Sequence, residues 1–86
     1  MRHFSSPKFW EACEKLPAQM RALAGKNFKL LKADPNHPSL QLKKIGRYWS
    51  VRIGRNYRAV AVEFDDGLLW FWIGAHSEYD RLLKQN

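Results

Sequence analysis

The chain has 86 residues, 45% of them hydrophobic, and its 15 Lys and Arg outnumber its 8 Asp and Glu to give a formal net charge of +7. A chain of this length supports one hydrophobic core, so residues 1–86 are expected to form a single domain. The single cysteine excludes an internal disulfide, and no apolar run approaches the roughly 20 residues that a membrane helix needs. We therefore expect a soluble cytoplasmic protein that does not associate with membranes.

Metal and cofactor chemistry find no support in the sequence. The three histidines, His3, His37 and His76, lie far apart in the chain, and no Cys and His cluster has the spacing of metal ligands. We therefore expect neither a metal ion nor a cofactor.

The first third of the chain predicts a helical hairpin. Residues 1–4 are compatible with a short strand or with disorder, and the sequence does not decide between them. Ser6 and Pro7 are typical of a helix start, because serine accepts a backbone hydrogen bond and proline lacks the N–H that would be unpaired there. Pro17 ends this helix and begins a second one, which ends at Asp34.

After the second helix the hydrophobic period changes from 3.6 to 2, which predicts four antiparallel strands. These strands are expected over residues 40–44, 48–53, 57–64 and 68–73. The last strand, LLWFWI, is apolar on both faces, as expected for a strand that is covered on both sides.

Two turn signals flank the last strand. Asp65-Asp66-Gly67 is typical of a hairpin turn, and we expect Gly67 to take the positive φ that the turn requires. Ser77 and Asp80 form an S-x-x-D pair, which predicts the cap of a short C-terminal helix that ends near residue 84.

The predicted fold is α+β. An N-terminal helical hairpin covers one face of a four-stranded antiparallel sheet, and a short C-terminal helix follows. The strand over residues 48–53 places Trp49, Val51 and Ile53 on one face and Ser50 and Arg52 on the other. We expect the face opposite the helices to carry Arg52 and its basic neighbours.

The positive charge is concentrated in one block. Residues 35–62 contain six basic residues and no Asp or Glu, so the rest of the chain, with 9 basic and 8 acidic residues, is nearly neutral. Hydrophobic residues alternate with these charges, which indicates folded strands with a basic surface. Such a surface is typical of a protein with a polyanionic partner.

Three segments together resemble the RelE/ParE superfamily of type II toxin–antitoxin toxins. They are DPNHPSL, LKKIGRYWSVRIGRNYRAVAVE and LLWFWIGAHSEYDRLL, and the closing GAHSEYD is most similar to the HigB-like and YafQ-like branches. The resemblance implies a RelE-like fold and a toxin that pairs with a cognate acidic antitoxin in a hetero-oligomer. RelE-like members cleave mRNA on the ribosome, whereas ParE-like members inhibit DNA gyrase.

The resemblance also implies site residues. Arg52 and Arg58 match family arginines on two neighbouring strands, His76 matches the Arg or His at the end of the last strand, and Tyr79 matches an aromatic residue near the substrate. Four further basic residues are candidates for RNA binding: Lys43, Lys44, Arg47 and Arg55. The two lysines point to opposite faces, so at most one of them lies in the site. Arg47 and Arg55 lie at turns, where a solvated charge is the competing and favoured interpretation. One departure is Ser50, which stands where the archetype has a lysine.

These residue types suit RNA cleavage without a metal. The reaction needs a group that takes the proton of the 2′-hydroxyl and cations that stabilise the charged phosphorane. Arg52 and Arg58 are the expected cations, His76 is the expected proton carrier, and Tyr79 is expected to stack on a base. The competing interpretation of Arg52 is a structural ion pair with Glu63 or Asp80.

Three functions remain open at this stage. The first is a ribosome-dependent mRNA endoribonuclease, which the histidine and the two arginines favour. The second is a ParE-like gyrase inhibitor. The third is a non-catalytic module that binds nucleic acid or only its antitoxin.

Overall fold

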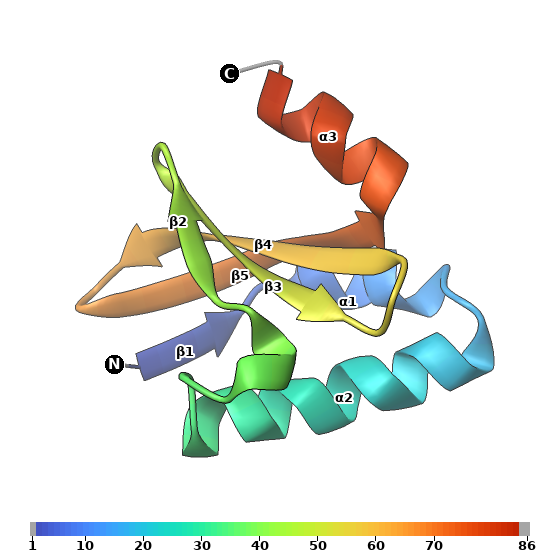
Figure 1. Cartoon of the computed structure of the whole chain (residues 1–86), viewed down its shortest axis with the longest axis horizontal. Coiled ribbons are helices and arrows are strands. Elements are labelled where there is room, and N and C mark those ends of the chain that lie inside the picture. The colour runs from blue at the N-terminus through green and yellow to red at the C-terminus, as the bar shows by residue number, and fades with distance from the viewer. Residues whose placement is uncertain (1, 85–86) are drawn as a thin grey trace.

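The computed structural model describes residues 2–84. Its elements in chain order are β1 (Arg2–Ser5), α1 (Pro7–Glu14), α2 (Ala18–Ala33), the 3-10 helix η1 (Pro38–Leu40), β2 (Lys43–Ile45), β3 (Tyr48–Ile53), β4 (Tyr57–Phe64), β5 (Gly67–Ala75) and α3 (His76–Lys84). Figure 1 shows these elements in three layers, with the sheet in the middle. The α+β fold is therefore confirmed.

The sheet has five strands in the order β1-β5-β4-β3-β2, which corrects the expected four. Strands β2 to β5 form the predicted antiparallel meander, whereas β1 pairs with β5 in parallel from Arg2↔Gly67 to Ser5↔Trp70. The four residues of β1 are too few to show a period of 2, and their partner strand lies at the other end of the chain. The local sequence therefore left this strand undecided.

Helices cover both faces of the sheet. Helices α1 and α2 lie against one face, with α2 running back beneath α1, and α3 lies against the opposite face (Figure 1). The face that was expected to carry Arg52 and its basic neighbours is therefore only partly open, because α3 occupies the rest of it.

The start of α1 follows the sequence prediction. Ser6 is its N-cap, and the Ser6 hydroxyl accepts a hydrogen bond from the backbone N–H of Phe9 at 3.3 Å. Two apolar residues of this helix, Phe9 and Cys13, are buried in the core between the helical hairpin and the sheet. That core also receives Val51 and Ile53 from β3, as their alternation predicts.

A β-bulge lets β5 fill two cores. Val60 pairs with Trp72 and Ala61 pairs with Trp70, so Phe71 is an extra residue in β5. Trp70 consequently belongs to the core beneath α1 and α2, whereas Phe71 and Trp72 contact the core beneath α3. This arrangement explains why the strand is apolar at consecutive positions.

Two boundaries differ from the prediction. Leu40 ends η1 and is fully buried, and Gln41 has a φ of 46°, so the first strand of the meander begins only at Lys43. At the other end of the sheet, α3 starts at His76, directly after β5. Ser77 therefore lies inside the first turn of α3 and is not its cap.

The hairpin between β4 and β5 also differs in detail. Asp65 and Asp66 have φ values of 48° and 62°, and Phe64 pairs with Gly67. The turn thus consists of the two aspartates, and Gly67 is the first residue of β5. Glycine is required at this position for another reason: a Cβ there would overlap the backbone carbonyl of Arg2 in β1.

Candidate functional site

Two arginines form the centre of the basic face. Arg52 on β3 pairs directly with Arg58 on β4, and Arg58 in turn pairs with Gly74 on β5. Both side chains are half-buried and belong to the sheet face that α3 partly covers. Directly opposed like charges on a sheet destabilise the fold, so this pair has no evident structural benefit.

Neither guanidinium forms an ion pair within residues 2–84. The two acids considered as partners for Arg52 have other partners: Glu63 Oε1 lies 3.5 Å from Lys44 Nζ, and Asp80 Oδ2 lies 3.3 Å from His76 Nδ1. One terminal nitrogen of Arg58, Nη1, is buried without a hydrogen-bond acceptor. A buried guanidinium donor without an acceptor costs free energy within this fold.

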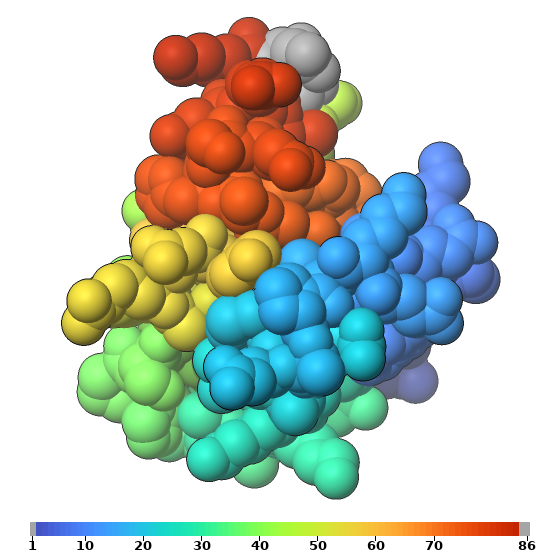
Figure 2. All heavy atoms as spheres, turned by 90° about the vertical axis from the view of Figure 1, so that its right-hand side faces the viewer, coloured from blue at the N-terminus to red at the C-terminus, as the bar shows by residue number. Residues whose placement is uncertain are grey.

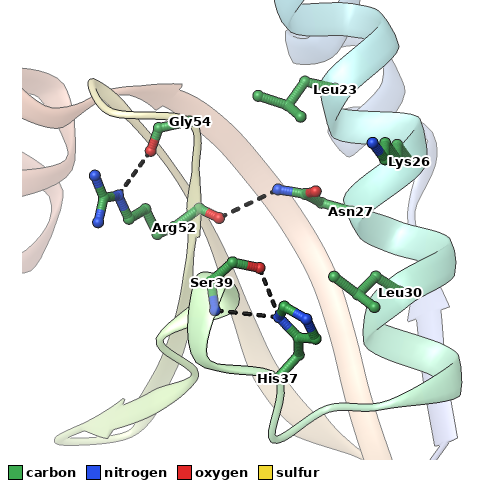
Figure 3. A pocket seen from close by; sticks show the side chains of 8 residues that line it. All are labelled: Leu23, Lys26, Asn27, Leu30, His37, Ser39, Arg52 and Gly54. Atoms are coloured by element: carbon green, nitrogen blue, oxygen red, sulfur yellow. Dashed lines mark hydrogen bonds between the residues drawn. The ribbon is translucent and has the colours of Figure 1, made fainter.

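The Arg52 side chain is held by its own strand end. Its Nε donates a hydrogen bond to the carbonyl of Gly54 at 2.8 Å, and the amide of Asn27 donates to the Arg52 carbonyl at 3.5 Å. Figure 3 shows that the guanidinium points away from α2, so its terminal nitrogens face the side of the sheet where Arg58 lies. The single bond to Gly54 leaves these nitrogens for a ligand.

Tyr79 lies beneath the second arginine. The Arg58 guanidinium carbon is 5.5 Å from the centre of the Tyr79 ring, and the Tyr79 hydroxyl donates a hydrogen bond to the Ser50 hydroxyl at 3.2 Å. Tyr79 is only 4% exposed and Ser50 only 1% exposed. In this structure the ring is therefore covered, and it is not open to stacking on a base as the sequence interpretation had it.

His76 joins this cluster through Tyr79. The two ring centres are 5.6 Å apart, and the backbone N–H of His76 donates to the carbonyl of Asn56 in the β3–β4 loop. In Figure 2 the start of α3, in orange, lies beside this loop, in yellow. Side-chain contacts thus connect His76 to Tyr79 and Tyr79 to Arg58. Arg52 pairs with Arg58 on the neighbouring strand.

The charged partner of His76 is Asp80, one helical turn later. An Nδ1–H that is donated to the carboxylate leaves Nε2 as the proton acceptor of the neutral ring. Both side chains are about half exposed, so the imidazole is accessible from solvent.

The lysines separate as their alternation predicts. Lys43 pairs with Ser50 and shares the face of Arg52, whereas Lys44 pairs with Trp49, faces the other way and lies near Glu63. The two turn arginines lie at the edge of the basic face. Arg47 contacts the ring of Tyr48 with its guanidinium, and Arg55 is exposed in the β3–β4 loop.

A groove of about 660 Å³ lies between β3 and α2, and Arg52 and Gly54 line it on the β3 side (Figure 3). Leu23, Lys26 and Leu30 line it from α2. On its connector side His37 accepts hydrogen bonds at Nδ1 from the backbone N–H and the hydroxyl of Ser39. His37 is therefore the N-cap of η1.

No group of three or more His, Cys, Asp or Glu side chains in residues 2–84 could hold a metal ion. No helix in the same range is long and apolar enough to cross a bilayer.

One buried histidine lies outside the basic face. His3 on β1 accepts a hydrogen bond at Nδ1 from Trp70 Nε1 at 3.1 Å, and its Nε2 is buried without a partner. Burial lowers the pKa of His3 below its usual value of 6.5.

Three contributors to the site were not foreseen from the sequence: Ser50, Gly54 and Asn27. Each acts through a contact that the fold creates, and only Ser50, which shares the face of Arg52 and stands at a family lysine position, was singled out by its sequence. The pairing of His76 with Asp80 did have a signal, because residues four apart on a helix lie side by side.

Solved structures share this architecture. The chain resembles the RelE toxin in the RelB–RelE antitoxin–toxin complex from Methanococcus jannaschii, with a TM-score of 0.70, 19% identity and coverage of 91% of this chain and 96% of that one. The YoeB/ParE toxin from Agrobacterium tumefaciens gives a TM-score of 0.66 at 20% identity, with coverage of 88% and 99%. The isolated E. coli RelE toxin gives 0.60 at 15% identity, with coverage of 96% and 95%.

These likenesses define the fold as that of small toxins of toxin–antitoxin systems. A family model for the ParE-like toxin domain matches residues 19–81, which is well over half of the chain. The chain therefore belongs to the ParE-like toxin domain family, within the RelE/ParE superfamily that its sequence resembles. No curated protein matched the chain by sequence.

Proposed function

We propose that this toxin is a ribosome-dependent endoribonuclease that cleaves mRNA in the cytoplasm and arrests translation. The observation that carries the proposal is the opposed pair of Arg52 and Arg58, which has no ion-pair partner among residues 2–84 and is linked to His76 through Tyr79. The structural similarity to RelE toxins supports mRNA as the target.

In the proposed reaction the 2′-oxygen attacks the adjacent phosphorus, and the bond from phosphorus to the 5′-oxygen breaks. The 2′-hydroxyl proton passes to Nε2 of His76, whose Nδ1 is directed toward Asp80. Arg52 and Arg58 stabilise the extra negative charge on the phosphorane. The 5′-oxygen takes up a proton from water and leaves as an alcohol, and a 2′,3′-cyclic phosphate remains.

We further propose that an acidic antitoxin segment neutralises the toxin at the same face. Three of the similar solved structures are complexes of a RelE toxin with a RelB antitoxin. A segment that placed carboxylates on Arg52 and Arg58 would occupy the positions proposed for RNA phosphate. The complex would then be an inactive toxin–antitoxin hetero-oligomer.

A ParE-like action on DNA gyrase is the second candidate, because the matching family model describes a ParE-like toxin domain. Induction of the protein in bacteria separates the two, when RNA 5′ ends and plasmid supercoiling are followed together. New mRNA 5′ ends with normal supercoiling support the ribonuclease. Altered supercoiling with intact mRNA supports gyrase inhibition, and neither change leaves a non-catalytic binding module.

A further inference from the structure

The contact between Arg58 and Tyr79 assigns Tyr79 a role other than base stacking. The ring is buried, its hydroxyl is bonded to a buried serine, and its face is directed toward a guanidinium. We propose that Tyr79 is a positioning residue, which holds Arg58 in the anion-binding site while Ser50 fixes the Tyr79 ring. The inference rests on the proposed function only in taking the natural anion to be an RNA phosphate.

The physical argument begins with the cost of the arginine pair. Arg58 lies directly opposite Arg52, so repulsion favours conformations in which one guanidinium swings away. Attraction between a cation and the face of an aromatic ring opposes that motion, and it is stronger in a half-buried site than on an open surface. The ring thus holds Arg58 close to Arg52 before any anion arrives.

Ser50 determines whether the ring can do this. Its hydroxyl lies on β3, two residues before Arg52, and it is the acceptor that fixes the Tyr79 hydroxyl. Because Tyr79 belongs to α3, its ring reaches Arg58 only when α3 is docked on the sheet. The position of the Arg58 side chain therefore depends on the docking of α3. Anion binding at the arginine pair and docking of α3 should therefore favour each other.

A double-mutant cycle with inorganic pyrophosphate as the probe tests this coupling in the full chain. Affinity is measured by titration, and the arginine Nε–H signals are followed by NMR. Tyr79→Leu removes the ring and is expected to weaken pyrophosphate binding about 3- to 30-fold and to move the Arg58 Nε–H signal. In an Arg58→Ala background the same Tyr79→Leu change is expected to have no further effect.

Equal losses with and without Arg58 would overturn the inference, as would full affinity in Tyr79→Leu. Should Tyr79→Leu fail to fold, Ser50→Ala carries the test, because it removes only the hydroxyl that fixes the ring. An unmoved Arg58 signal and unchanged affinity in Ser50→Ala then count against the proposal. Tyr79→Phe keeps the ring but loses the same hydrogen bond to Ser50, so it should lose affinity as Ser50→Ala does, and less than Tyr79→Leu.

The pyrophosphate measurement does not depend on RNA cleavage. A wild type that shows the coupling but cuts no RNA would retain this inference and remove the proposed function. If the wild type cuts RNA but the Tyr79→Leu and Arg58→Ala changes have additive effects on pyrophosphate affinity, the proposed function stands and this inference is overturned.

Discussion

Arg52 and Arg58 face each other across neighbouring antiparallel strands, and no acid among residues 2–84 pairs with either of them. Like charges at directly opposed positions cost about 0.2–1 kcal/mol. The arrangement is understandable if an anion binds between the two arginines.

The stability of Arg52→Gln tests this interpretation without any activity assay. The change relieves the repulsion but loses the hydrogen bond to Gly54, and the two effects are of similar size, so the unfolding free energy should stay within about 1 kcal/mol of wild type. Denaturant unfolding measures it, with the loop variant Arg55→Gln as the matched control. A loss of several kcal/mol in Arg52→Gln alone would make Arg52 a structural residue.

The β4–β5 hairpin gives a prediction that separates backbone conformation from space. Asp66 has a positive φ, so Asp66→Gly should leave stability unchanged or raise it by up to about 1 kcal/mol. Gly67→Ala should lower the melting temperature, because the added Cβ meets the Arg2 carbonyl and displaces β1. A lower melting temperature for Asp66→Gly than for Gly67→Ala would contradict this account and would favour Gly67 as the glycine that the turn requires.

Stability should fall in mild acid because of His3. Its pKa is lowered in the folded protein, so below about pH 6.5 the unfolded chain binds more protons. The His3 contribution is therefore complete above pH 6.5 and is lost as the pH falls through the folded pKa. Urea unfolding as a function of pH should show a smaller decline in His3→Gln, whose carbonyl can still accept the Trp70 hydrogen bond. Parallel pH profiles in the two proteins would contradict this account.

The two adjacent lysines allow a matched test of the antitoxin surface. Lys43 shares the face of Arg52, whereas Lys44 lies on the other face near Glu63. Lys43→Gln should weaken antitoxin binding and reduce its salt dependence, and Lys44→Gln should change both less. Titrations at several salt concentrations measure the difference. Equal effects of the two variants, or binding that salt does not weaken, would place the interface elsewhere.

Much of the fold was predictable because local patterns specify it. Ser6 capped α1 as expected, and the alternation of β3 placed Val51 and Arg52 on opposite faces. The sequence could not place β1, whose pairing with β5 joins the two ends of the chain. The sequence also gave the wrong reason for Gly67. A side chain at this position would overlap the backbone carbonyl of Arg2, which belongs to the same distant strand β1.

The site divides in the same way. Arg52, Arg58 and His76 were identified by resemblance, and the structure connects them through Tyr79. The burial of Tyr79 could not be predicted, since it depends on α3 folding back onto the sheet and on the hydroxyl of Ser50.

The most direct measurement is single-turnover cleavage of mRNA on programmed ribosomes by wild type, His76→Gln, Arg52→Gln and Arg55→Gln. Wild type and Arg55→Gln should cut at similar rates. Loss of the proton acceptor should slow His76→Gln about 10²–10⁴-fold, and loss of the charge-stabilising donor should slow Arg52→Gln about 10²–10³-fold. Cleavage by His76→Gln and Arg52→Gln at the wild-type rate, or no cleavage by wild type, would contradict the assignment of this site as a ribonuclease centre.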